Sequence, residues 1–238
     1  MALLGRAVFF LAVPSAVAAF VCPASPRLTA PPRHAPVKAF TQIIPVANVG
    51  LGGALLYRAA TTHAGGTNSV VLASTGLLAT LNLAVTDNAR YASAKRAVAK
   101  VENEELPLAK LAKQWSTAVR VQVFGQLASL LWMTRAASPA GVLRGAAAFM
   151  AANVAFFLLG AGDSKHDEVG VIAPMTHKLK KFVLTTDLVL LGAALLGATL
   201  ANPLGSIGAY VYAAGCLIGA AEGVPKTVAA LMALSGAP

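Results

Sequence analysis

An acid, Asp187, interrupts an apolar stretch that runs from Phe182 to Ala201. A carboxylate in apolar surroundings is costly unless something compensates its charge, so it can take up a proton or a small cation. Arg120 lies at a similar distance from the start of another apolar stretch. The two residues predict either a proton or cation relay or an ion pair that joins two helices. The ion pair, or an acid that reaches the surface, is favoured because Asp187 is close to the start of its stretch.

Five amide side chains also lie in apolar stretches of the chain. They are Asn48, Asn82, Gln122, Gln126 and Asn153. Such groups can line a polar path through a membrane, or they can form hydrogen bonds between helices that are worth about 0.6 kcal/mol each. An amide or an acid can also ligate the magnesium of a chlorophyll. The candidate transport site therefore consists of Asp187 and Arg120 with these amides, and no cofactor is identified.

Six apolar stretches must position these groups. They are Ile43–Ala60, Ser69–Val85, Trp115–Met133, Ala140–Ala161, Phe182–Ala201 and Leu204–Val224. Each is close to the ~20 residues that a helix needs to cross ~30 Å of hydrocarbon. Only 12% of the 238 residues are charged and 57% are hydrophobic, which leaves too little polar surface for a water-soluble domain. The sequence predicts an all-α polytopic membrane protein with about six transmembrane helices in three hairpins, within residues 41–238. A soluble bundle of six apolar helices is the alternative.

The charged residues predict how the hairpins are oriented. Fifteen Lys and Arg residues follow residue 40, and all but Arg58, Arg135 and Arg144 lie on the side opposite the tight turns. The positive-inside rule places that side in the compartment from which the protein is inserted. Residues 88–103 have the pattern of an amphipathic helix in the membrane interface. Leader and loops thus account for the formal charge of +10 without a nucleic-acid partner. The expected partners are the lipid bilayer and, as a further candidate, other membrane proteins.

Glycines recur at helical spacing in two of the spans. Gly215, Gly219 and Gly223 are four residues apart, and Gly50 and Gly53 lie close together in the first span. Small residues allow helix backbones to approach closely within a membrane, where lipid supplies no hydrophobic drive for association. We therefore expect these five glycines to lie at helix–helix contacts.

The first 40 residues have the composition of a targeting leader. Residues 1–19 combine Arg6 with an apolar run that ends in small residues, as in a secretory signal peptide. Residues 20–40 are basic, rich in proline and free of acids, which is typical of a disordered transit peptide. The sequence Val17-Ala18-Ala19-Phe20, with Phe directly after the cleavage site, resembles the bipartite presequence of plastid proteins in algae with complex plastids. This resemblance implies a thylakoid or envelope membrane. A plain secretory signal with a disordered linker, and hence a secretory-pathway membrane, is the alternative.

A segment between the second and third spans supports a weaker interpretation. Arg96-Ala97 followed by Glu102–Pro107 is similar to the first cytosolic motif of the membrane-associated eicosanoid and glutathione metabolism family. The resemblance implies that Arg96 and Glu104 help to hold glutathione. Lys100 stands where that family has an Asn, and the family has four spans.

The sequence contains no cluster of residues that predicts a reaction. The charged loop at residues 163–168 has metal-ligand residue types, but such runs are usually solvated, and we predict neither a metal site nor catalytic residues. The favoured function is a small-solute or ion transporter in a plastid membrane. The alternatives are a structural or assembly subunit of a thylakoid membrane complex and, more weakly, a glutathione-linked membrane enzyme.

Overall fold

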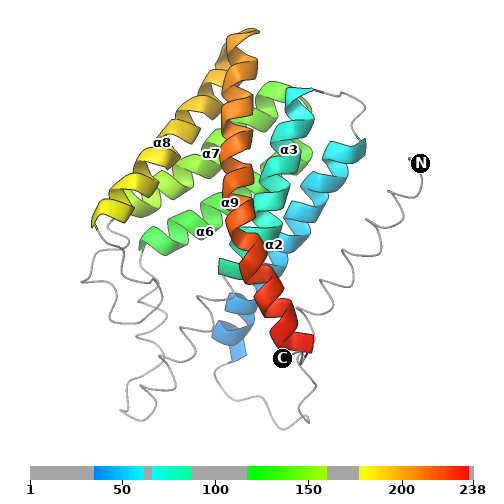
Figure 1. Cartoon of the computed structure of the whole chain (residues 1–238), viewed down its shortest axis with the longest axis vertical. Coiled ribbons are helices and arrows are strands. Elements are labelled where there is room, and N and C mark those ends of the chain that lie inside the picture. Colours follow the sequence, from blue (N-terminus) through cyan, green and yellow to red (C-terminus); the bar gives the residue numbers. More distant parts are fainter. Residues whose placement is uncertain (1–34, 62–65, 87–116, 160–176, 236–238) are drawn as a thin grey trace.

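The computed structural model describes residues 35–61, 66–86, 117–159 and 177–235, and all regular structure in these ranges is helical (Figure 1). The elements are α2 (Ala35–Thr61), α3 (Thr67–Leu77), the π-helix η1 (Leu78–Leu83), α6 (Thr117–Arg135), α7 (Pro139–Leu158), α8 (His177–Thr199) and α9 (Leu204–Ser235). Five helical stretches are long and apolar enough to cross a membrane. The remaining helix, α6, has 19 residues and is more polar because it contains Arg120, Gln122 and Gln126. The predicted all-α polytopic fold is confirmed.

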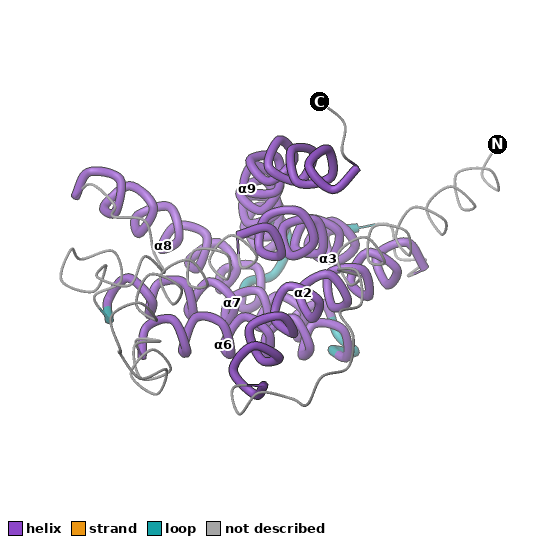
Figure 2. The backbone as a smooth tube through the Cα atoms, turned by 90° about the horizontal axis from the view of Figure 1, so that it is seen from below, coloured by secondary structure: helices purple, strands orange, loops and turns teal. Residues whose placement is uncertain are grey.

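The helices form a closed ring of packed neighbours. The hairpins α2–α3, α6–α7 and α8–α9 are joined by contacts of α7 with α8, of α3 and η1 with α9, and of α2 with α6. Figure 2 shows α9 and α6 on opposite sides of this arrangement, with α3, α2 and α7 between them. In Figure 1 the ends that each hairpin connects lie towards the top of the molecule. The three pairs predicted from the sequence are therefore the units of the fold.

The helices differ from the predicted spans mainly at their ends. Helix α8 begins at His177, before the predicted start at Phe182, and α9 continues through Pro225 to Ser235. Helix α2 begins at Ala35, before the predicted start of the first span at Ile43. Residues 1–34, the amphipathic segment 88–103, the glutathione-family motif and the charged loop 163–168 lie outside the described residues.

Local chemistry fixes the turn of the second hairpin. Ser138 is the N-cap of α7, and its hydroxyl accepts a hydrogen bond from the Gly141 amide at 3.1 Å, while Pro139 starts the helix. The end of α6 is capped from another hairpin, because the Arg58 guanidinium of α2 donates to the carbonyl oxygens of Met133 and Ala136. A cation at a helix C-terminus is favourable. This cap explains why Arg58 lies on the side of the tight turns.

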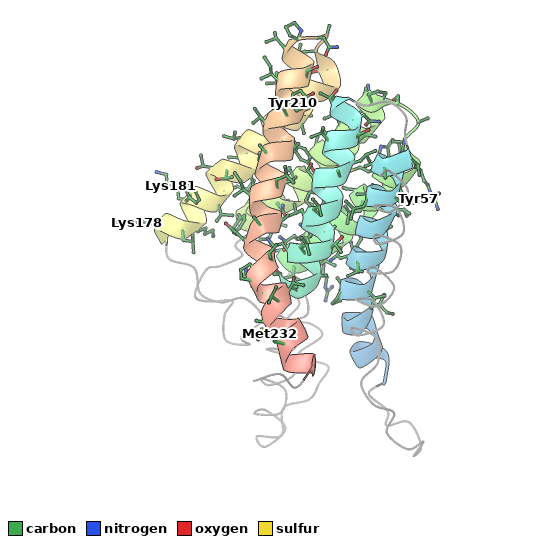
Figure 3. All side chains as sticks on the ribbon, turned by 45° about the vertical axis from the view of Figure 1, so that its right-hand side comes forward. Tyr57, Lys178, Lys181, Tyr210 and Met232 are labelled. Atoms are coloured by element: carbon green, nitrogen blue, oxygen red, sulfur yellow. The ribbon has the colours of Figure 1, made fainter. Side chains whose placement is uncertain are left out.

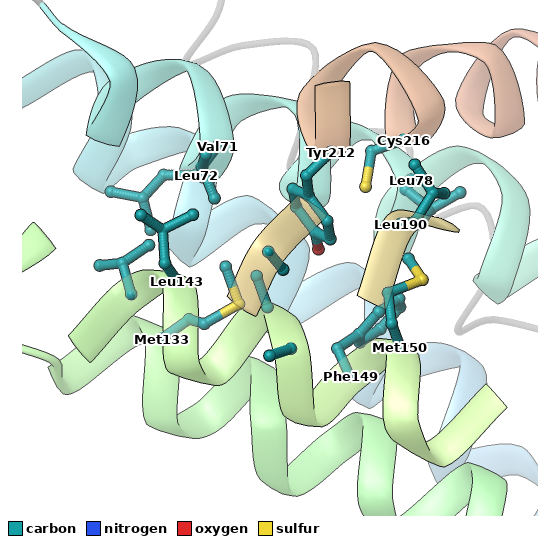
Figure 4. Packing of buried hydrophobic residues seen from close by; sticks show 14 of the residues in the cluster. Val71, Leu72, Leu78, Met133, Leu143, Phe149, Met150, Leu190, Tyr212 and Cys216 are labelled. Carbon is teal, nitrogen blue, oxygen red and sulfur yellow. The ribbon is translucent and has the colours of Figure 1, made fainter. Parts of the chain in front are cut away.

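Every described helix, including the π-helix η1, contributes residues to one buried apolar cluster. Val71, Leu72, Met133, Phe149 and Tyr212 are among its fully buried members (Figure 4). A smaller cluster joins α2, α6 and α7 near the other end of the bundle, and there the rings of Phe156 and Phe157 stand edge to face at 5.1 Å. Many large apolar side chains point outward, as the lipid-facing surface of a membrane protein requires.

Exposed side chains mark the two ends of the bundle. Tyr57, Trp132 and Tyr210 are more than half exposed, and each lies near the turn of a different hairpin. Lys178 and Lys181 are exposed at the start of α8, at the opposite end (Figure 3). Aromatic residues and lysines of this kind concentrate where a membrane meets water. The two groups therefore bracket the segment of the bundle that lies in hydrocarbon.

Candidate functional site

Three of the predicted amides form one cluster between α6 and α7. The side-chain amide of Gln122 donates to the Asn153 side-chain oxygen at 3.0 Å, and that of Gln126 donates to the same oxygen at 2.6 Å. Gln122 and Gln126 are four residues apart and therefore lie on one face of α6. Both are buried. These amides hold two helices together, since each glutamine donates across the contact to a residue of the neighbouring helix.

Asn82 binds the last helix through a distortion that the sequence does not predict. It lies in the π-helix η1, and its side-chain amide donates to the Gly219 carbonyl of α9 at 2.8 Å. The Thr227 hydroxyl lies 3.2 Å from the Leu81 carbonyl oxygen and 2.9 Å from the Gly223 carbonyl of its own helix. A π-helix widens the backbone spiral and is often found at functional positions. Here the wide turn faces α9, donates to it through Asn82 and accepts from it through the Leu81 carbonyl.

The glycines of α9 lie at helix contacts, as expected. A Cβ atom at Gly215 would collide with the Leu190 side chain of α8, and one at Gly219 would lie 2.9 Å from the Leu78 side chain. At Gly223 the obstacle is backbone, because Cβ would lie 2.5 Å from the Leu81 carbonyl oxygen. Such contacts allow α9 to approach both neighbours closely.

The closest described helix contact of the first span lies at a glycine other than the two expected. A Cβ at Gly50 would meet no described atom within 4 Å, so its predicted packing role is wrong. The close approach occurs at Gly52, where Cβ would lie 2.8 Å from the Gly76 carbonyl oxygen of α3. Gly53 is only half-buried. The difference arises because adjacent helical positions point about 100° apart, and glycine spacing alone does not say which one faces a neighbour.

A buried hydroxyl pair joins α3 to α9, and sequence reasoning missed it. Thr75 and Tyr212 are both fully buried, and their hydroxyl oxygens lie 3.0 Å apart. The Thr75 hydroxyl also lies 2.8 Å from the Val71 carbonyl and donates to it, so it accepts from Tyr212. The buried Cys216 thiol lies beside both hydroxyls. A tyrosine in the middle of an apolar span was the available signal, since a buried phenol needs a partner.

Asp187 and Arg120 are not brought together. Asp187 is half-buried on α8, near enough to Cys216 of α9 to act on it electrostatically. No ion pair joins it to Arg120, which is exposed on α6. Helix α7 packs along both α6 and α8 and lies between them. The predicted helix-locking ion pair is therefore wrong, because similar depth along two helices does not make them neighbours.

The remaining predicted residues are Asn48, Arg96 and Glu104. Asn48 is buried on α2. Within the described part of the chain, no three His, Cys, Asp or Glu residues form a group that could hold a metal ion. Arg96 and Glu104 lie outside the described residues, so the glutathione interpretation stays a prediction. The polar groups inside the bundle are thus distributed over separate helix contacts: α6 with α7, α3 with α9, and η1 with α9.

Comparison of the chain with protein-family models, with curated proteins and with solved structures found no match in any of the three.

Proposed function

We propose that this chain is a structural or assembly subunit of a protein complex in a plastid membrane. The observation that carries the proposal is the use of the amides at membrane depth. Gln122, Gln126 and Asn82 all donate to groups on neighbouring helices. A solute path would need polar groups that converge on one space, whereas these groups are divided between two different helix contacts and stiffen the bundle.

The close approach of the helices supports the same proposal. Gly52 lies against Gly76, and Gly223 lies against the backbone of Leu81, so two pairs of helices are in near-backbone contact. A packed core with discrete contacts resists continuous deformation. A stiff bundle with an apolar outer surface suits a subunit that holds partner membrane proteins in place.

Native purification tests the assembly role. Full-length protein carrying a C-terminal tag is solubilised from its own membranes in mild detergent and separated by native electrophoresis. We expect it to migrate with other membrane proteins at fixed stoichiometry. Recovery as a single chain or as a homo-oligomer alone would contradict the proposal.

Transport is a second candidate because of Asp187. This acid lies within a membrane-spanning helix and has no ion pair with any described residue, so a proton or a small cation could balance its charge. Proteoliposomes of the purified protein should then show proton or cation flux that Asp187→Asn abolishes. Wild-type vesicles without flux would exclude this candidate.

The plastid assignment rests on the leader and is tested separately. Residues 1–40 fused to a fluorescent protein should direct it to the plastid of an alga with a complex plastid. Replacement of Phe20 by Ala should divert the fusion to the secretory pathway, since the resemblance places that residue directly after the cleavage site. Secretion of the unaltered fusion would favour the secretory-membrane alternative.

A further inference from the structure

Two exposed arginines lie near the turn of the second hairpin. Arg135 is the last residue of α6, and Arg144 is the sixth residue of α7. The third arginine at this end of the bundle, Arg58, caps α6. The positive-inside rule leaves this side of a membrane protein poor in basic residues, so topology does not account for the other two.

The indole of Trp132 lies between the two arginines. Its Nε1 donates to the Gly141 carbonyl oxygen at 3.0 Å, and a Cβ at Gly145 would lie 3.0 Å from its ring. The ring therefore covers the turn of α7 that contains Arg144, which is three residues from Gly141 and on the same face. Arg135 is three residues after Trp132 and shares its face of α6. Both arginines thus flank one indole on the outward side of the hairpin.

The same outward side continues into the membrane as apolar surface. Leu131 is exposed four residues before Arg135, and Phe124 is exposed two turns further along α6. On α7, Ala148 is exposed four residues after Arg144. The face therefore presents cations near the end of the bundle and apolar side chains next to them at greater depth.

No acid among the described residues lies at this end of the bundle. The described ranges contain two acids, Asp187 and Glu222. Asp187 is twelve residues, about 18 Å of helix, from the end of α8 at Thr199. Glu222 is eighteen residues, about 27 Å of helix, from the start of α9 at Leu204. The connected ends of the hairpins lie together (Figure 1), so both acids are far from the two arginines along the bundle.

We propose that the face formed by Arg135, Trp132 and Arg144 binds an anionic phospholipid. The planar guanidinium groups match the oxygens of a phosphate, and basic pockets between membrane helices bind anionic headgroups in this way. An indole is well suited to the depth of the headgroups. A lipid supplies both the negative charge and an acyl chain that covers Leu131 and Ala148 below the arginines. The proposal goes beyond the assembly function and does not depend on it.

Trp132 itself can report the bound lipid. The chain has two tryptophans, so Trp132 is the only one in full-length protein carrying Trp115→Phe. This protein is reconstituted in phosphatidylcholine vesicles with a small fraction of lipid whose acyl chains carry bromine, which quenches tryptophan fluorescence on contact. Each arginine near an anionic lipid contributes a factor of about five, so brominated phosphatidylglycerol should associate about twenty-five-fold more strongly than brominated phosphatidylcholine.

Matched variants separate this site from general charge attraction. Arg135→Gln/Arg144→Gln should abolish the preference for phosphatidylglycerol. Lys178→Gln/Lys181→Gln removes the same number of charges from exposed positions at the opposite end and should keep the preference. The thermal stability of the arginine variant in phosphatidylcholine should match that of the wild type because both side chains are exposed, which separates lost binding from unfolding.

Four outcomes would overturn the proposal. Equal quenching by the two brominated lipids would show that only bulk lipid covers this face. A preference that survives in Arg135→Gln/Arg144→Gln would place the lipid elsewhere. Displacement of the brominated phosphatidylglycerol by inorganic phosphate would identify a water-soluble anion as the occupant. Absence of a lipid preference, together with loss of a partner protein from native membranes in the same variant, would assign the arginines to an acidic segment of that protein.

Discussion

Gly223 of α9 lies directly on the backbone of Leu81, and a Cβ atom at position 223 would stand 2.5 Å from the Leu81 carbonyl oxygen. Leu81 belongs to the π-helix η1, and its carbonyl oxygen lies 3.2 Å from the Thr227 hydroxyl of the same helix α9. The side chain of the next residue, Asn82, donates to the Gly219 carbonyl at 2.8 Å. The widened turn and the glycines of α9 therefore form one contact between the first and third hairpins.

We expect Gly223→Ala to destabilise the protein by about 1–3 kcal/mol, because the added methyl group meets backbone that cannot rotate away. The measurement is thermal unfolding in detergent, followed by circular dichroism. Gly192→Ala is the matched control, since a Cβ there meets no described atom within 4 Å and alanine favours a helix over glycine. Equal stability of the two variants would argue against close contact at Leu81.

Asn153→Leu should cost about 1–3 kcal/mol, because it leaves the amides of both Gln122 and Gln126 without their acceptor. Changing all three residues to Leu removes the stranded donors together with the acceptor. The triple variant should therefore be more stable than Asn153→Leu alone in the same unfolding measurement. A triple variant less stable than Asn153→Leu would show that the remaining glutamines stabilise the fold even without the Asn153 acceptor.

The two members of the buried hydroxyl pair should respond differently to mutation. Thr75→Val leaves the fully buried Tyr212 hydroxyl without its acceptor and should cost about 1–3 kcal/mol. Tyr212→Phe should cost about 0.5–1.5 kcal/mol, since the Thr75 hydroxyl keeps its bond to the Val71 carbonyl. In a double-mutant cycle the combined change should cost less than the sum of the two. Additive effects would show that the hydroxyls do not interact.

Arg58→Ala should destabilise the contact between the first and second hairpins by about 1–2 kcal/mol, because the end of α6 loses its cationic cap. Arg144→Ala is the control, as this arginine lies at the same end of the bundle and is exposed. Limited proteolysis at the turn 136–138 reports the local effect. We expect faster cleavage of the Arg58→Ala protein than of the Arg144→Ala protein. Equal cleavage rates would contradict the role of Arg58 as the cap of α6.

Hydropathy located the membrane segments well because burial in hydrocarbon requires an apolar run of fixed length. Hydropathy misplaced the helix ends, because a helix continues beyond the hydrocarbon wherever the next residues favour helical structure. Lys178 and Lys181 illustrate this, because the apolar run begins after them whereas α8 begins at His177. The π-helix η1 was missed because its residues have no local pattern that distinguishes them from an α-helix.

Pairing between helices was the harder part of the prediction. Gln122 and Gln126 lie on one face because they are four residues apart, but their acceptor, Asn153, depends on how α7 is rotated about its axis. Arg120 and Asp187 were matched by depth alone. The order of helices around the ring separates them, and a count of residues along each span carries no information about that order.

The contacts that close the ring join segments that are synthesised far apart in time. Thr75 and Tyr212 are separated by 137 residues, and Leu81 and Thr227 by 146. Until α9 packs against the first hairpin, the Asn82 amide and the Leu81 carbonyl of that hairpin lack their partners on α9. These polar groups are satisfied only when the whole chain is present, so a chain that ends before α9 should form a less stable bundle.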